Sequence, residues 1–169
     1  KQHQVKIGAH PGFPDLVGFG RRDLNATPDE AKNYVIYQIG ALRAFTGTEN
    51  LQHVKPHGAL YNMAARDAGL AKAMVDAILE VDRSLILVAL SGTEWIKIGE
   101  KAGLKVASEV FADRAYNPDG SLASRRLPGA VIEDQKEVVS RGVRMATEGK
   151  VTAINGKDLE VRADTICLH

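Results

Sequence analysis

Acidic, basic and imidazole side chains of this chain gather just after segments that have the composition of β-strands. His10 follows residues 5–9 and His57 follows residues 51–55. In parallel α/β folds the carboxyl ends of the strands lie along one edge, so residues distant in sequence converge there. The other polar residues at or near such strand ends are Asp15, Arg21, Arg22, Lys55, Tyr61, Asn62, Glu109, Asp113, Arg114 and His169. The sequence therefore predicts one shared site at that edge.

These residue types suit two kinds of chemistry. Imidazoles exchange protons near neutral pH, which suits general acid/base catalysis. Histidines and carboxylates together also hold divalent cations. Each group has an ordinary structural interpretation as well, because a single histidine after a strand commonly serves a loop, and Asp113 beside Arg114 is the pattern of a surface ion pair. The residues alone leave an acid/base site and a metal site both open.

His57 stands in the segment Lys55-Pro56-His57-Gly58. Proline fixes its own φ near about −65°, and glycine lets another group approach the backbone closely. We expect Gly58 to allow the close approach of a ligand.

Strand and helix patterns alternate along the chain. A helix is expected from the Thr27 cap and Pro28 through residue 45, because Asp29 and Glu30 follow in the first turn. Asn155-Gly156 between two short alternating segments predicts a hairpin. The other expected strands cover residues 5–9, 51–55, 85–90, 105–111 and 165–168, and the other expected helices cover 67–81, 93–102 and 133–147.

This alternation predicts a single α/β domain over residues 1–169 with a parallel sheet. Five parallel strands are too few to close an eight-stranded barrel, which typically takes about 250 residues. The remaining choices are an open doubly wound sheet and a truncated barrel.

Composition excludes several classes of protein. Lys and Arg number 22 against 21 Asp and Glu, and they form no basic stripe, so nucleic acid is not an expected partner. The longest aliphatic run, residues 85–90, is far shorter than a membrane span. A single cysteine, Cys167, points to the cytoplasm. The first residues contain no initiator Met and no apolar signal region, so we expect the natural start to lie upstream.

No nucleotide-binding glycine motif, paired-cysteine motif or zinc-helix motif occurs, so any ATP would be held in another way. Read as whole strings, however, several segments resemble the LamB/YcsF family of lactam-utilization proteins, whose members also carry the name of the A subunit of 5-oxoprolinase. They are Ile7-Gly8-Ala9-His10-Pro11-Gly12-Phe13-Pro14-Asp15, Gly18-Phe19-Gly20-Arg21-Arg22, Tyr37-Gln38-Ile39-Gly40-Ala41-Leu42, His53-Val54-Lys55-Pro56-His57-Gly58-Ala59-Leu60-Tyr61-Asn62, Glu109-Val110-Phe111-Ala112-Asp113-Arg114 and Thr165-Ile166-Cys167-Leu168-His169.

The resemblance implies an irregular (β/α) barrel related to the glycoside hydrolase and polysaccharide deacetylase type. It also implies that the chain is an incomplete copy, a fragment of a longer chain that lacks the N-terminal strands and the C-terminal end. The open side of such a barrel is expected between residues 5–9 and residues 165–168.

The activity that the resemblance implies is the opening of 5-oxo-L-proline to L-glutamate, coupled to hydrolysis of ATP, with magnesium, by a complex with subunits B and C. Alternatives are a metal-dependent amidase or deacetylase of carbohydrate and a non-catalytic scaffold subunit. Whether this chain binds a metal stays undecided. Residues expected in catalysis are His10, Lys55, His57, Glu109, Asp113 and His169. Residues expected to bind substrate or phosphate are Asp15, Arg21, Arg22, Tyr61, Asn62 and Arg114.

Overall fold

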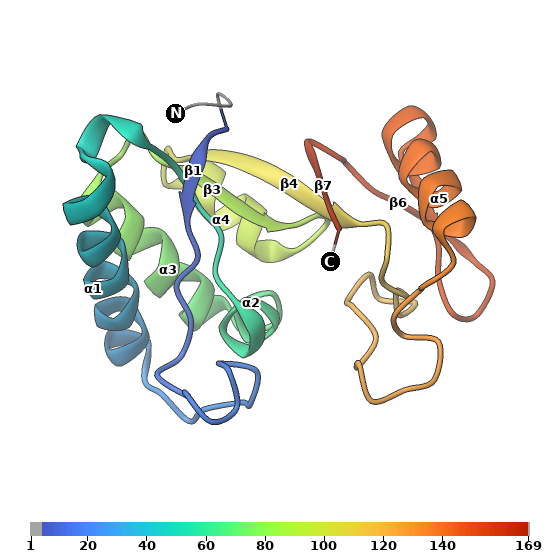
Figure 1. The fold of residues 1–169 in the computed structure, drawn as a ribbon, viewed down its shortest axis with the longest axis horizontal. Coiled ribbons are helices and arrows are strands. Elements are labelled where there is room, and N and C mark those ends of the chain that lie inside the picture. The colour runs from blue at the N-terminus through green and yellow to red at the C-terminus, as the bar shows by residue number, and fades with distance from the viewer. Residues whose placement is uncertain (1–4, 169) are drawn as a thin grey trace. The chain divides into compact units, whose positions relative to one another are not determined.

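The computed structural model describes residues 5–168 (Figure 1). Its contacts divide the chain into two compact units. The first unit runs to Ala89 and adds Glu94–Val106, and the second consists of Leu90–Thr93 and the chain from Ala107 onward. The two units are described separately, and the expectation of a single domain stays a prediction.

Three parallel strands form the sheet of the first unit. They are β1 (Ile7–Ala9), β2 (Leu51–Val54) and β3 (Ile86–Leu90), and β2 pairs with both of the others. Gly8 lies opposite His53 in the β1–β2 register, and the His53 ring occupies the space where a Cβ at Gly8 would lie. The parallel strands confirm the α/β class, because each one is reached through a helical crossover.

Helices α1 (Pro28–Thr46) and α3 (Ala68–Val81) pack side by side against these strands (Figure 1). α1 begins with a capping box, in which the Thr27 hydroxyl accepts from the Glu30 N–H at 3.2 Å and the Glu30 carboxylate accepts from the Thr27 N–H at 2.8 Å. α3 begins at Asp67, whose carboxylate accepts from the backbone of Gly69 and Leu70. Apolar side chains from both helices fill the core, namely Ala31, Val35, Ile39, Leu70, Met74 and Ile78.

Two shorter helices complete the first unit. α2 (Gly58–Ala64) follows β2 directly, and α4 (Glu94–Lys101) packs on α3. Trp95 of α4 is fully buried and meets the Tyr61 ring edge-on at 5.6 Å between ring centroids. A short 3-10 turn, Thr48–Asn50, links α1 to β2.

The second unit is built on the parallel pair β4 (Lys105–Phe111) and β7 (Thr165–Cys167), with α5 (Gln135–Glu148) between them in sequence. β5 (Lys150–Thr152) and β6 (Asp158–Glu160) form the expected antiparallel hairpin around Gly156, whose φ is 80°. Burial raises the pKa of Tyr116, whose oxygen accepts from the Phe111 N–H at 2.8 Å.

Two arginines, the buried Arg114 and the half-buried Arg141, organise the long connection between β4 and α5. Arg114 donates to the carbonyls of Ala123 at 2.6 Å and Ala130 at 3.2 Å. Arg141 of α5 donates to the carbonyls of Ala112 and Arg114. A guanidinium with several donors suits a connection that has many backbone carbonyls and few strands to pair with.

Candidate functional site

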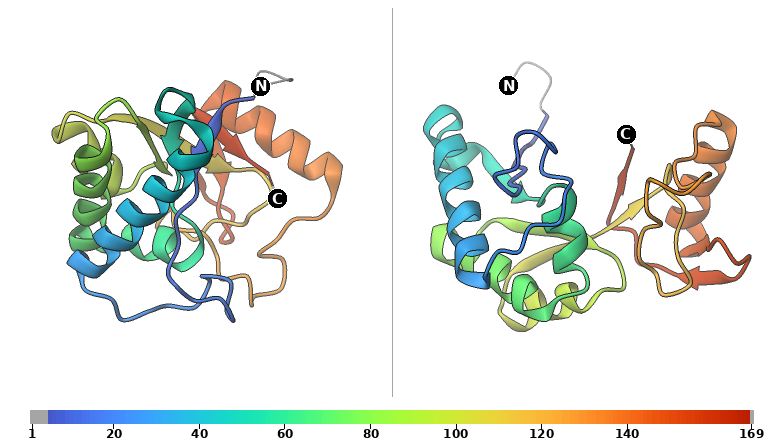
Figure 2. Two further views of the ribbon diagram at one scale, coloured as in Figure 1. Left: turned by 60° about the vertical axis from the view of Figure 1, so that its left-hand side comes forward. Right: turned by 90° about the horizontal axis from the view of Figure 1, so that it is seen from below.

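The loop after β1 lies against the segment that joins β2 to α2. The Lys55 N–H donates to the Ala9 carbonyl at 2.9 Å, and the His57 N–H donates to the Pro11 carbonyl at 2.8 Å. Further along, the Ala59 N–H donates to the Gly20 carbonyl at 2.9 Å. Figure 2 shows this loop, coloured blue, curling toward α2 at one end of the first unit. Parallel strands β1 and β2 end together, and so His10 and His57 are placed side by side.

The two histidines contact each other directly. Nδ1 of His57 lies 3.0 Å from Nε2 of His10, and the rings meet edge-on with centroids 4.9 Å apart. The other nitrogen of each ring faces a backbone carbonyl: His10 Nδ1 lies 2.6 Å from the Lys55 oxygen, and His57 Nε2 lies 2.7 Å from the Phe19 oxygen. This pair is the part of the predicted acid/base site that the first unit brings together.

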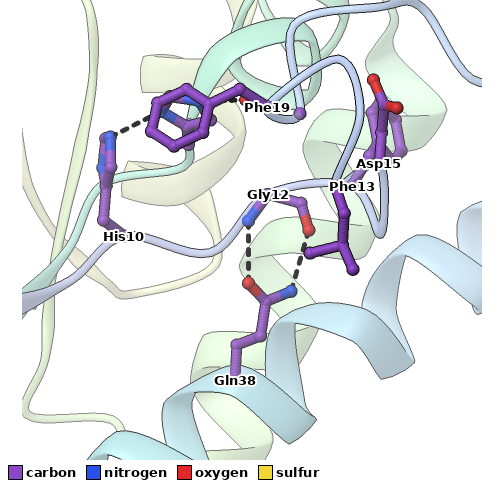
Figure 3. Close-up of a pocket in the computed structure, with 9 residues that line it drawn as sticks. His10, Gly12, Phe13, Asp15, Phe19 and Gln38 are labelled. Atoms are coloured by element: carbon purple, nitrogen blue, oxygen red, sulfur yellow. Dashed lines mark hydrogen bonds between the residues drawn. The ribbon is translucent and has the colours of Figure 1, made fainter.

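Gln38 of α1 positions the backbone beside this pair. Its side-chain oxygen accepts from the Gly12 N–H at 3.0 Å, and its amide donates to the Gly12 carbonyl at 2.8 Å (Figure 3). The amide also donates to the Tyr34 carbonyl within α1. The sequence pattern did not indicate Gln38 as a site residue. The available signal was a polar side chain at a position of the helix's apolar stripe.

Phe19 carries local backbone strain. Within residues 5–168 it is the one non-glycine residue with a positive φ, 54°, a conformation that costs energy for a bulky side chain. Its carbonyl receives the His57 ring, and its own ring meets the His57 ring edge-on at 5.1 Å. The strained residue therefore presents the acceptor that orients His57.

Gly58 serves a different purpose from the expected one. Its φ is 57°, and a Cβ at this position would collide with the Gly20 carbonyl oxygen. We expected this glycine to allow the approach of a ligand. In the structure, the group that approaches it is the loop backbone, because the Gly20 carbonyl oxygen occupies the space where a Cβ at Gly58 would lie. The glycine lets the loop close onto α2.

Three of the residues predicted to bind substrate or phosphate are engaged within the loop. Asp15 pairs with Arg22 through both carboxylate oxygens and accepts from the Gly18 N–H at 2.9 Å. The hydrogen bond from Arg22 is the largest cause that lowers the pKa of Asp15 to about 2. Arg21 lies over the Phe19 ring, with its guanidinium carbon 5.3 Å from the ring centroid.

A cleft of about 250 Å³ opens between the loop, the histidine pair and α1. Ligand pockets for drug-sized molecules typically measure roughly 300–1,000 Å³. The cleft is therefore of a size that suits a small molecule. Its lining combines imidazole, carboxylate and amide groups with apolar side chains: His10, Gly12, Phe13, Asp15, Leu16, Phe19, Gly20, Gln38 and His57.

The other predicted residues of the first unit lie around α2. Tyr61 is 4% exposed and contacts Trp95, so its ring belongs to the core. Asn62 is exposed and donates to the Gly58 carbonyl at 3.1 Å. The Lys55 side chain is half-buried, and its carbonyl holds the His10 ring.

The second unit contains the remaining predicted residues that the structure describes. Glu109, Asp113 and Arg114 are each at most 5% exposed, so Asp113 and Arg114 are not the surface ion pair that the sequence also allowed. The backbone carbonyl of Glu109 accepts a hydrogen bond from the Ser91 N–H at 2.9 Å. His169 lies outside the described residues, and its assignment stays a prediction.

Within residues 5–168, no group of three or more histidine, cysteine or acidic side chains has the geometry of a metal site. In the same part of the chain no helix combines the length and the apolar character that crossing a membrane requires.

Comparison with known proteins identifies this architecture. The chain is 51% identical to a lactam utilization protein from Thermus thermophilus of known crystal structure, with a TM-score of 0.91 over 99% of this chain and 69% of that one. This match confirms the predicted α/β fold as an incomplete barrel.

The LamB/YcsF family model matches residues 1–169, and the chain belongs to that family. The A subunit of 5-oxoprolinase from Pyrococcus abyssi is 57% identical over all of this chain and 67% of its own length. Its counterpart from Alkaliphilus metalliredigens, which has the same name, is 60% identical over 99% of this chain and 66% of its own length. The chain thus spans about two thirds of the curated relatives that it matches.

Proposed function

We propose that the full-length protein acts as the A subunit of an ATP-dependent 5-oxoprolinase, which opens 5-oxo-L-proline to L-glutamate together with subunits B and C. The observation that carries this proposal is the identity of 52% or more, over essentially the whole chain, to relatives named as the A subunit of 5-oxoprolinase. The size of the cleft beside His10 and His57 supports it, because a five-membered lactam is a small ligand.

The chemistry explains the need for ATP. A five-membered lactam is a resonance-stabilised amide, so direct attack by water is slow. Phosphorylation of the carbonyl oxygen would make the carbon more electrophilic. It would also turn that oxygen into part of a good leaving group, phosphate. The sequence contains no nucleotide-binding glycine motif, so we assign use of ATP, with magnesium, to the assembled enzyme.

The roles of the residues follow from their chemistry. His10 and His57 are the general acid/base pair, because they stand in contact at the cleft. Arg21 and Lys55 are the candidate cations for the substrate carboxylate or for phosphate. Glu109 and Asp113 stay candidates for the base or for the acceptor of the ring N–H. The engagement of Arg22 with Asp15 favours a role for both in shaping the loop.

The test is an assay of glutamate release by the full-length protein, with and without subunits B and C and ATP. The proposal predicts release only when all components are present. Turnover by the isolated protein with ATP would contradict the requirement for partners. Absence of release from the complete mixture, accompanied by hydrolysis of an acetylated carbohydrate, would replace lactam opening with the deacetylase alternative.

A further inference from the structure

The hydrogen-bonding pattern of the histidine pair defines how many protons it holds. Backbone carbonyls only accept hydrogen bonds, so His10 Nδ1 must carry a proton toward Lys55 and His57 Nε2 must carry one toward Phe19. If both rings were neutral, the nitrogens that face each other at 3.0 Å would both be lone pairs. Two lone pairs at that separation repel, whereas a proton between them makes a hydrogen bond.

We propose that His10 and His57 share one proton across this contact and that this shared proton is the one delivered to the ring nitrogen when the lactam opens. The pair then acts as a single cationic unit. The proton-delivery part of this inference rests on the proposed function, whereas the sharing of the proton depends on geometry alone.

The three protons of the pair are not equivalent. Loss of either outer proton would leave an imidazole lone pair facing a carbonyl oxygen at 2.6 or 2.7 Å. Loss of the shared proton leaves both carbonyl contacts intact and breaks only the contact between the rings. The shared proton is therefore the transferable one, and the Lys55 and Phe19 carbonyls keep the rings in place while it moves.

The transfer balances within the ring-opening step. As the carbon–nitrogen bond breaks, its electron pair goes to the ring nitrogen, which takes the shared proton. Water adds its hydroxyl group to the carbonyl carbon, and its other proton returns to the pair. Repulsion between the two facing lone pairs favours this return. The ring-opening step consumes one activated lactam and one water and restores the pair. When the carbonyl oxygen carries phosphate, a second water then hydrolyses the resulting acyl phosphate to glutamate and phosphate.

The loop that carries His10 also holds charged side chains. In the loop, Asp15 is paired with Arg22, and Arg21 stacks on Phe19. On the β2 side, the Lys55 backbone holds His10. The Asp15 carboxylate, which lines the cleft, is thus already paired with a cation.

The first test is nitrogen-detected NMR of the full-length protein with 15N-labelled histidine at neutral pH. The proposal predicts protons on His10 Nδ1 and His57 Nε2 and a further proton coupled to both inner nitrogens. Two neutral rings, each protonated on the outer nitrogen alone, would overturn it. This readout needs no turnover, so it distinguishes failure of this inference from failure of the proposed lactam chemistry.

The second test uses two substitutions that each keep one half of the His57 contacts. His57→Gln places an amide near the Nε2 position and can still donate to the Phe19 carbonyl; His57→Asn places one near Nδ1 and can still meet His10. Neither amide carries a transferable proton. We expect both to lower kcat of the complete enzyme by about 100-fold or more, the magnitude typical of general acid/base groups. Retention of turnover by either variant, with folding preserved, would show that His57 is structural.

Discussion

Asp15 and Arg22 close the loop after β1 through a paired carboxylate and guanidinium. This pairing, together with the Gly18 N–H, holds the pKa of Asp15 at about 2, below its usual value of 3.8. A carboxyl group with a lowered pKa in the folded state stabilises that state while it is ionised. Its contribution is therefore complete above pH 3.8 and is lost as the pH falls through about 2.

We predict that Asp15→Asn makes the full-length protein less stable at neutral pH and less sensitive to acid between about pH 4 and about pH 2, the interval over which Asp15 takes up its proton. The measurement is the melting temperature as a function of pH. Asp23→Asn is the matched control, because Asp23 is an exposed carboxylate of the same loop and makes no hydrogen bond within residues 5–168. An acid profile unchanged by Asp15→Asn would contradict the assignment.

At the level of single residues, the sequence predicted that His10 and His57 lie at the same edge of the sheet, but not how their rings contact each other. Placement after strands 5–9 and 51–55 was enough to bring His10 and His57 together, because parallel neighbouring strands end at the same edge. The hydrogen bonds by which Gln38 holds Gly12 and the Phe19 carbonyl contacts the His57 ring could not be predicted. Each depends on a contact between segments whose meeting no local pattern encodes.

Local signals predicted the longer elements well. The Thr27 cap, the proline after it and the acidic first turn predicted α1, and the structure confirms its capping box. α2 was missed because seven residues give too little periodicity to show a helical pattern. Without α2, the burial of Tyr61 could not be predicted, because Tyr61 lies on the face of α2 that contacts Trp95.

Glycines in two helices of the first unit offer a test of the packing. A Cβ at Gly99 of α4 would lie 2.9 Å from Val106 Cγ2 and 3.2 Å from Leu87 Cδ2, whereas a Cβ at Gly40 of α1 would meet nothing within 4 Å. Replacing glycine by alanine inside a helix gains roughly 0.5–1 kcal/mol. Overpacking typically costs about 1–3 kcal/mol.

We therefore predict that replacing glycine by alanine changes the free energy of unfolding in opposite directions at Gly40 and Gly99. Gly40→Ala should raise the free energy of unfolding of the full-length protein by up to about 1 kcal/mol. Gly99→Ala should lower it by about 1–2 kcal/mol, because the cost of overpacking exceeds the gain in helix propensity. Denaturant unfolding measures both. Equal stabilisation by the two substitutions would show that α4 does not pack closely against β3 at Gly99.

For the molecule as a whole, the sequence predicted the class of fold because alternation of strands and helices is a repeated signal. It could not choose between an open sheet and a truncated barrel, since that difference depends on strand tilt and curvature, which arise from packing. The likeness to the lactam utilization protein from Thermus thermophilus made that choice. The relatives are about half as long again as this chain, so we assign the proposed activity to the full-length protein with its partners.

In the proposed enzyme, the cleft beside His10 and His57 receives the lactam. The most direct test is a crystal structure of the full-length protein with 5-oxo-L-proline bound. We predict that the lactam occupies the cleft between the Gly12–Gly20 loop and the histidine pair, with its ring nitrogen within hydrogen-bonding distance of one imidazole. A lactam bound elsewhere, with this cleft unfilled and the His10–His57 contact unchanged, would contradict it.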